Sequence, residues 1–174
     1  MVEKGDVEMT GKKKIKINNT CNADGRTATN MNSETLLEST EEHRRNVHDG
    51  MDYIAELIHE RGLKHDYTKV GSYFQLFNDT VMQGLSNEEF EKSEWKQLHL
   101  HQERHHLNGN VPIDVNLIDV IEMLVDVVMA GNGRSGHVSS YYCKIRDPAI
   151  LERAYWNTIK LLDDVVEVKE GDDE

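Results

Sequence analysis

The chain has 174 residues and 20.0 kDa, with 20 basic and 32 acidic residues and a formal net charge of -12. This length suits one domain, and the acidity argues against a protein that coats nucleic acid polymers. Two cysteines, Cys21 and Cys143, do not make a disulfide framework, and the sequence shows neither an apolar run of about 18 residues nor a signal-peptide core. We therefore expect a cytoplasmic protein without a membrane partner.

The two ends of the chain are polar. Residues 1–38 contain few large apolar side chains and are typical of a flexible arm, in which the alternating segment 14–17 could pair as a strand. Residues 163–174 contain seven acidic residues and one lysine, so this segment carries half of the net negative charge of the chain. We expect a helical domain over residues 39–165 and an acidic, solvated tail over 166–174.

The first helical signals lie between residues 39 and 82. A capping box at Ser39 and Glu42 predicts the start of a helix, and Gly62 fits its end. Four apolar residues at helical spacing predict its buried face: Val47, Met51, Ile54 and Ile58. A second helix is expected over residues 65–82, with these side chains buried: Val70, Tyr73, Phe74 and Phe77.

The second half of the chain gives further helix signals. Ser86 predicts the start of a third helix, and Asp147-Pro148 opens the last one. The segment 113–131 is apolar on nearly every side, which predicts a helix at the centre of a bundle, followed by a glycine-rich loop. The fold class is therefore all-α, a single bundle of five or six helices.

All nine histidines lie between His43 and His137. His43 continues the predicted buried face of the first helix, and the doublet His65-Asp66 opens the second. Asp126 lies on the most apolar helix, where an unpaired carboxylate would be costly. Imidazoles and carboxylates that converge from several helices are ligands for a first-row divalent metal. Glu122 shares a helix face with Asp126 and could orient a histidine ligand.

The order H…HD…H…HH…D resembles the HD-domain superfamily of metal-dependent phosphohydrolases. The resemblance implies a first metal held by His43, His65, Asp66 and Asp126. It implies a second metal held by Asp66, His99 and one or both of His105 and His106. The form HDYTK, residues 65–69, implies that Lys69 faces the phosphate of the substrate.

Four segments, HDYTK, HHLN, DVIEMLVD and Trp156-Asn157-Thr158, are similar to a small and largely uncharacterised HD-like family. Its members are frequently encoded by phages or prophages, which implies the host cytoplasm as location. The similarity covers roughly residues 41–162.

Some histidines and loop residues have alternative interpretations. His101 and His105 are spaced by four, which can also chelate a metal, although the family pattern favours His99. His48 and His59 are interpreted as surface or packing residues. The glycine-rich loop supplies three candidate substrate contacts, which are Arg134, Ser135 and His137. The last helix supplies Asn157, which is interpreted first as a packing residue and second as a substrate contact.

The resemblance implies a metal-dependent phosphohydrolase that acts on a small phosphate ester, such as a nucleoside monophosphate or cyclic nucleotide. The cofactor would be one or two divalent metals, from iron, manganese, zinc, cobalt and nickel, with magnesium a further candidate. Asp66 and Lys69 would be the catalytic residues. Two alternatives are a di-iron oxygenase of the same superfamily and a non-catalytic protein that sequesters a nucleotide. The sequence is compatible with a homodimer.

Overall fold

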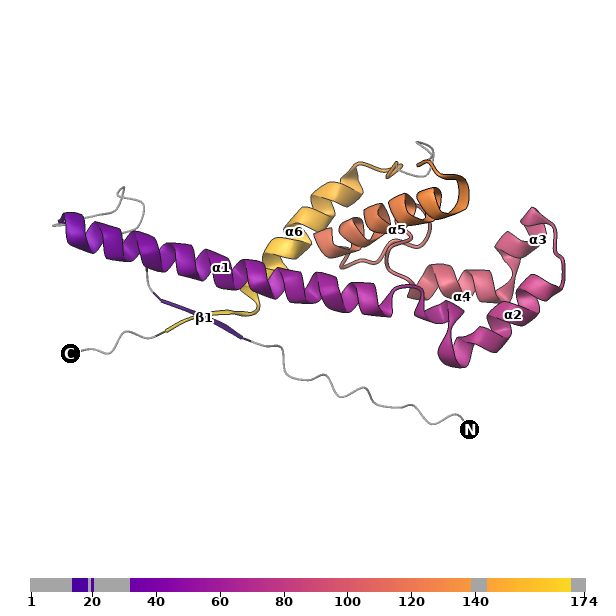
Figure 1. The fold of residues 1–174 in the computed structure, drawn as a ribbon, viewed down its shortest axis with the longest axis horizontal. Helices are drawn as coiled ribbons and strands as arrows, with labels where there is room; N and C mark the ends of the chain where they lie inside the picture. The colour runs from indigo at the N-terminus through magenta and orange to yellow at the C-terminus, as the bar shows by residue number, and fades with distance from the viewer. Residues whose placement is uncertain (1–13, 19, 21–31, 139–143, 170–174) are drawn as a thin grey trace. The chain divides into compact units, whose positions relative to one another are not determined.

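The computed structural model describes residues 14–18, 20, 32–138 and 144–169. This part of the chain forms six α-helices and two short strands (Figure 1), which confirms the all-α class apart from the small sheet. The chain divides into two units, residues 1–54 with 160–174 and residues 55–159. Most of the expected arm, and both cysteines, lie outside the described residues. Within the described helices, no run is long and apolar enough to cross a membrane.

A two-stranded parallel sheet belongs to the first unit. Strand β1, Ile15–Ile17, pairs with β2, Val166–Val168, with Ile15 opposite Val166. The backbone N–H of Ile15 donates to the carbonyl of Val165 at 2.8 Å, and both side chains are buried. The strand predicted over residues 14–17 is thus confirmed. Its partner strand comes from the segment that was expected to be only a solvated tail. This pairing was not predicted, because the two strands lie about 150 positions apart in the sequence.

Helix α1, Ser33–Lys64, is longer at both ends than the sequence predicted. The side chain of Asn32 accepts hydrogen bonds from the backbone of Glu34 and Thr35, both at 2.9 Å, and so caps the helix seven residues before Ser39. Gly62 lies inside the last turn instead of ending the helix. The predicted buried face is wrong at Val47 and Met51, which are exposed.

The segment after α1 forms two 3₁₀ turns, Tyr67–Lys69 and Gly71–Tyr73, before helix α2, Phe74–Met82. The predicted single helix over 65–82 is therefore wrong in its first half. Asp66 and Gly71 have positive φ values of 56° and 57°, which an α-helix does not tolerate. With this change of direction Val70 and Phe74 are exposed, against expectation, and Thr68 is buried.

Two short helices follow. Helix α3, Asn87–Lys92, starts after Ser86 as predicted, with a capping box between Ser86 and Glu89. Helix α4, Glu94–Gln102, starts anew at Ser93, whose extended backbone separates the two helices and whose hydroxyl accepts from the N–H of Lys96. Helix α4 carries His99 toward the interior.

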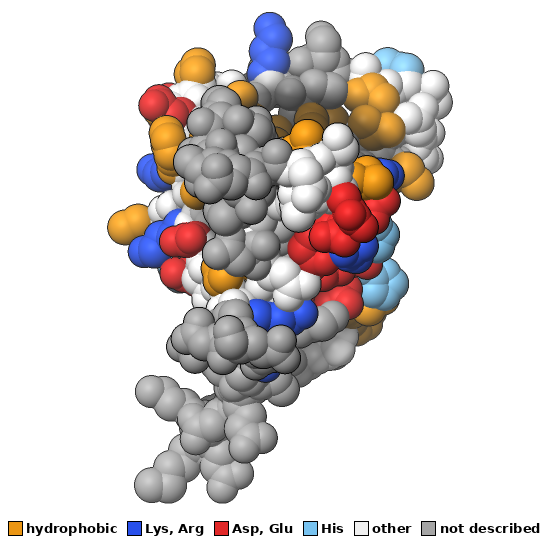
Figure 2. All heavy atoms as spheres, turned by 90° about the vertical axis from the view of Figure 1, so that its left-hand side faces the viewer, with side chains coloured by type: hydrophobic (Ala, Val, Ile, Leu, Met, Phe, Trp, Pro, Cys, Tyr) orange, Lys and Arg blue, Asp and Glu red, His pale blue; other side chains and the backbone are white. Residues whose placement is uncertain are grey.

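Helix α5, Leu117–Ser135, is capped by Asn116 and continues through the expected glycine loop to Gly136, whose φ is 71°. Its predicted burial on nearly every side is wrong. Ile118, Val120 and Met123 are buried, whereas Val125 and Met129 are exposed. Hydrophobic side chains are visible between charged ones on the face of the molecule in Figure 2.

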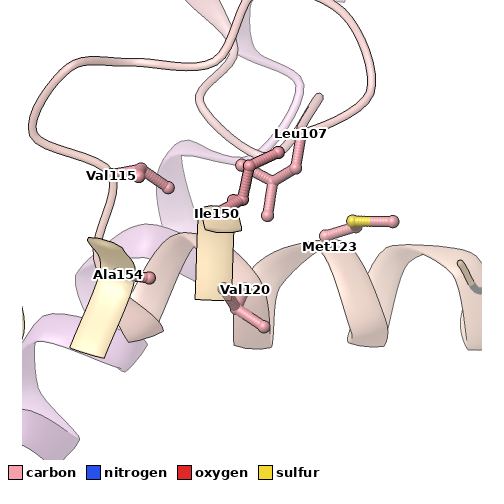
Figure 3. Packing of buried hydrophobic residues seen from close by; sticks show 6 residues of the cluster. All are labelled: Leu107, Val115, Val120, Met123, Ile150 and Ala154. Atoms are coloured by element: carbon pink, nitrogen blue, oxygen red, sulfur yellow. The ribbon is translucent and has the colours of Figure 1, made fainter. Parts of the chain in front are cut away.

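The core of the second unit joins α5 to helix α6, Ala149–Asp163 (Figure 3). It consists of Leu107, Val115, Val120, Met123, Ile150 and Ala154. The hydroxyl of Thr158 accepts from the N–H of Leu117 at 2.9 Å and donates to the carbonyl of Ala154 at 2.8 Å. The start of α6 after Asp147-Pro148 is confirmed, and these contacts fix α5, which carries Glu122 and Asp126.

Candidate metal centre

The HD doublet lies where the chain leaves α1. The helix ends at Lys64, and the left-handed backbone of Asp66 turns the chain into the first 3₁₀ turn. Because aspartate tolerates this conformation better than most residues, the turn can carry a carboxylate. The ammonium of Lys69 lies 2.5 Å from Oδ2 of Asp66, so the turn closes on itself through an ion pair.

The imidazole of His65 lies among three carboxylates. Its Nδ1 is 3.0 Å from Oε1 of Glu122, and its Nε2 is 3.4 Å from Oδ2 of Asp66 and 3.5 Å from Oδ1 of Asp126. The hydrogen bonds with Asp126 and Glu122 raise the pKa of His65 to about 10, although burial opposes this. The surroundings of Nε2 therefore favour a positive charge, which a proton or a metal ion can supply.

Glu122 joins two histidines. Its Oε1 is 3.0 Å from Nδ1 of His65 and 3.1 Å from Nδ1 of His105. A carboxylate only accepts hydrogen bonds, so both Nδ1 atoms donate, and each Nε2 is directed to the other side of its ring. Burial acts to raise the pKa of Glu122, but the hydrogen bonds from His105 and His65 lower it to about 2. Glu122 thus holds the rings of His65 and His105 through their Nδ1 atoms.

His99 and His106 form the second half of the cluster. Their Nε2 atoms lie 2.7 Å apart. Burial is the main cause that lowers the pKa of His99 to about 3 and that of His106 to about 4. Both rings are therefore neutral at pH 7, which is the form in which imidazole binds a metal.

The carboxylate of Asp66 has one buried oxygen without a partner. Oδ2 pairs with Lys69, but Oδ1 makes no hydrogen bond in the described structure. Nε2 of His99 lies 3.7 Å from Oδ1, and Nε2 of His105 lies 3.9 Å from it. A buried carboxylate oxygen without a donor is costly, and a cation between these three atoms would remove that cost. The donor set therefore fits a metal ion.

Three groups of ligand atoms among the described residues lie close enough to hold such an ion, each within 4.8 Å. They are His65 with His105 and Asp126, Asp66 with His99 and Glu103, and Glu103 with His105 and Glu122. The structure thus brings together six of the seven residues expected to bind metal, namely His65, Asp66, His99, His105, His106 and Asp126.

His43 is the exception. It is an exposed residue of α1 in the first unit, and none of the three groups contains it. All three groups lie in the second unit, so the metal binding expected of His43 stays a prediction.

Asp119, on the same helix as Asp126, is a structural acid. It is fully buried and accepts two hydrogen bonds of 2.8 Å from Arg104, in the bidentate geometry of a strong ion pair. The guanidinium of Arg61 approaches to 3.3 Å, and the N–H of Asn116 donates at 3.0 Å. The hydrogen bonds with Asp119 are the main cause that raises the pKa of Arg104 above its usual range. Asp119 thus anchors the start of α5.

A cavity of about 670 Å³ opens at the cluster, within the usual size range of small-molecule sites. His99, His105, His106 and Asp126 form part of its wall. Four basic side chains line it as well, and these are Lys69, Lys96, Arg134 and Arg146. Aromatic rings complete one side, from Phe77, Phe90 and Trp95.

The remaining expected substrate contacts fall elsewhere. Of the four, the described lining of the cavity includes only Arg134, which lies in the last turn of α5 instead of a loop. Ser135 donates to the carbonyl of Gly131 at 3.1 Å, and His137 is exposed. Asn157 donates to the carbonyl of Val115 at 2.8 Å, which supports its interpretation as a packing residue.

Sequence reasoning missed two buried residues of the centre, Thr68 and Glu103. The hydroxyl of Thr68 lies 2.7 Å from Nδ1 of His99 and donates to Oε1 of Glu103 at 2.7 Å. The only signal in the sequence was the spacing, because Glu103 follows His99 by four residues, which places both on one side of a helix.

The chain belongs to a protein family of unknown function, DUF5662, whose model matches residues 32–158. The match includes every residue of the cluster. No curated protein and no solved structure matches this sequence.

Proposed function

We propose that this protein is a metal-dependent phosphohydrolase that acts on a small phosphate ester through metal-activated water. The observation that carries the proposal is the unpaired buried Oδ1 of Asp66, which faces Nε2 of His99 and His105 beside a cavity lined by basic side chains. The order of the histidines and the HDYTK segment, which resemble the HD superfamily, support the same chemistry.

The donor set favours a first-row transition metal. Imidazole nitrogens together with carboxylates suit zinc, iron, manganese, cobalt or nickel, whereas magnesium prefers oxygen ligands and retained water. When bound, such a metal lowers the pKa of a coordinated water and polarises a phosphoryl oxygen. The proposed ligands come from the six clustered residues, without His43.

The lining of the cavity matches a phosphate group. Lys69, Lys96 and Arg134 supply positive charge and hydrogen-bond donors at the wall that also carries the histidines. The net charge of -12 repels a nucleic acid polymer as a whole. A compact ester such as a nucleoside monophosphate or a cyclic nucleotide satisfies both conditions.

Lys69 has two roles in this proposal. Its ammonium pairs with Asp66 in the structure and also lines the cavity. A metal ion at Asp66 would neutralise the carboxylate, so that the ammonium is available for the phosphate of the substrate. Lys69 would then bind substrate, while Asp66 holds the metal.

The test is phosphate release from a panel of phosphate esters by protein loaded with each metal in turn. Asp66→Ala should lower release by about 100-fold or more, because it removes a proposed ligand. His59→Ala is the matched control, since His59 is an exposed histidine of the same unit and should not affect release. Equal release by the wild type and Asp66→Ala would contradict the proposal. Tight nucleotide binding without release would indicate the sequestering protein, and a mixed-valent iron signal would indicate the oxygenase.

A further inference from the structure

A hydrogen-bond chain lies at the Nδ1 edge of the His99 ring. Oε1 of Glu103 accepts from the backbone N–H of Thr68 at 3.0 Å and from its hydroxyl at 2.7 Å. The same hydroxyl oxygen lies 2.7 Å from Nδ1 of His99. All three residues are buried, so water does not compete for these bonds.

The direction of each bond follows from counting hydrogens. A carboxylate only accepts, and a threonine hydroxyl has one hydrogen, which Thr68 donates to Glu103. The hydroxyl can then only accept from His99, so Nδ1 of His99 is the atom that carries the hydrogen. A neutral imidazole has a single N–H, which leaves Nε2 of His99 with a lone pair.

The plane of the ring is fixed as well. The indole of Trp95 stacks on the imidazole of His99, with centroids 4.9 Å apart and an angle of 20° between the rings. The indole N–H in turn donates to the carbonyl of Thr68 at 3.0 Å. His99 is therefore held both at its edge and on its face. Its Nε2 lies 2.7 Å from Nε2 of His106 and 3.7 Å from Oδ1 of Asp66.

We infer that Glu103 and Thr68 are positioning residues that hold His99 in the Nδ1–H form and so present Nε2 as a metal ligand. The inference rests on the metal site of the proposed function. Glu103, 35 residues after Thr68 in the sequence, would thus control the tautomer of His99 without a direct hydrogen bond to its ring. His65 and His105 receive the same control directly from Glu122, whereas His99 receives it through an intervening hydroxyl.

The first measurement is the tautomer of His99 in metal-free protein, read from its ¹⁵N NMR signals at neutral pH. We expect the Nδ1–H form in the wild type and in Thr68→Ser, which keeps the hydroxyl. Thr68→Val keeps the shape but removes the acceptor, so the Nε2–H form should be populated. An Nε2–H tautomer in the wild type would overturn the inference.

The second measurement is affinity for cobalt(II) alone, followed by its visible absorption. Thr68→Val should weaken binding by about 10- to 100-fold, the usual effect of losing such an orienting partner, and Thr68→Ser should restore it. Thr80→Val is the matched control, because Thr80 is a buried threonine whose hydroxyl donates within its own helix, to Leu76 at 2.8 Å. Its affinity should equal that of the wild type.

A second variant covers the case in which Thr68→Val does not fold. Glu103→Gln keeps the shape of the side chain, but its amide can also donate to the Thr68 hydroxyl, so the Nδ1–H preference and the cobalt affinity should both fall. Unchanged affinity in the folded variants would overturn the positioning role while leaving the metal site intact. A wild-type chain that does not bind cobalt(II) would instead contradict the proposed function, and with it the role assigned here, whatever the tautomer.

Discussion

Replacing Asp126 by asparagine, with Asp119→Asn as its partner variant, tests which carboxylate of α5 binds metal and which supports the fold. Both residues are on one helix and the substitution is the same. The side chain of Asp126 is 31% exposed and lies 3.5 Å from Nε2 of His65, whereas that of Asp119 is fully buried against Arg104. The pKa of Asp126 is lowered by its hydrogen bond with His65, so it is a carboxylate at neutral pH.

The expected magnitudes differ clearly. Asp126→Asn breaks a partly exposed pair and should change the free energy of unfolding of the metal-free chain by about 0–1 kcal/mol. Asp119→Asn breaks a buried bidentate pair and should cost about 3–5 kcal/mol. A metal at 100 times its dissociation constant stabilises the wild type by about 2.7 kcal/mol, and a 100-fold weaker affinity reduces this to about 0.4 kcal/mol in Asp126→Asn.

The assay is urea denaturation of both variants with and without zinc, together with metal stoichiometry. We expect Asp126→Asn to lose the stabilisation by zinc and Asp119→Asn to keep it at a lower baseline. The reasoning is refuted if Asp126→Asn loses about 3 kcal/mol in the metal-free state while its zinc stoichiometry is unchanged.

Three further predictions concern the whole unit and its centre. In metal-free protein, the free energy of unfolding should be highest near pH 6–7. Below about pH 6.5 it falls because the unfolded chain binds protons that His99 and His106, with pKa values of about 3 and about 4, do not bind in the folded state, and above about pH 6.5 it falls because the stabilisation from His65 is lost as the pH rises toward its pKa of about 10. Denaturant titrations at pH 5, 6.5 and 9 check this, and a free energy that only rises or only falls with pH would contradict it. A chelator should lower the melting temperature of protein as isolated with its metal, and restoring zinc should reverse the change, because a ligand that binds only the native state stabilises it. Asn116→Ala should cost about 1 kcal/mol, since the side chain accepts from the N–H groups of Ile118 and Asp119, and an unchanged denaturation midpoint would show that this cap contributes nothing.

The parts of the fold that the sequence predicted well are those set by local chemistry. The helix starts at Ser86 and at Asp147-Pro148 both appear where they were expected. Local signals failed where a competing signal nearby was stronger. Asn32 displaced Ser39 as the start of α1, and α5 passed through Gly131 and Gly133 to end at Gly136.

The candidate site divides in a similar way. His65, Asp66 and Asp126 could be placed together because an ordered motif carries long-range information that single positions lack. His43 matched the same motif, but it belongs to the other unit, and its role as a ligand stays a prediction. The contacts of Thr68 with His99 and Glu103 span 31 and 35 residues, and no local rule predicts such side-chain pairs.

At Asp66, which has a left-handed backbone, the residue that best suits the stability of the metal-free fold differs from the residue that the proposed metal site needs. Aspartate at φ 56° is strained relative to glycine, and its buried Oδ1 adds a second unfavourable contribution in the absence of metal. Glycine at this position would relieve both and would lose the partly exposed pairs with Lys69 and His65, which contribute little. A selection for thermal stability alone, carried out without metal, would therefore tend to erase the aspartate, and an aspartate kept at this position would reflect selection for its carboxylate.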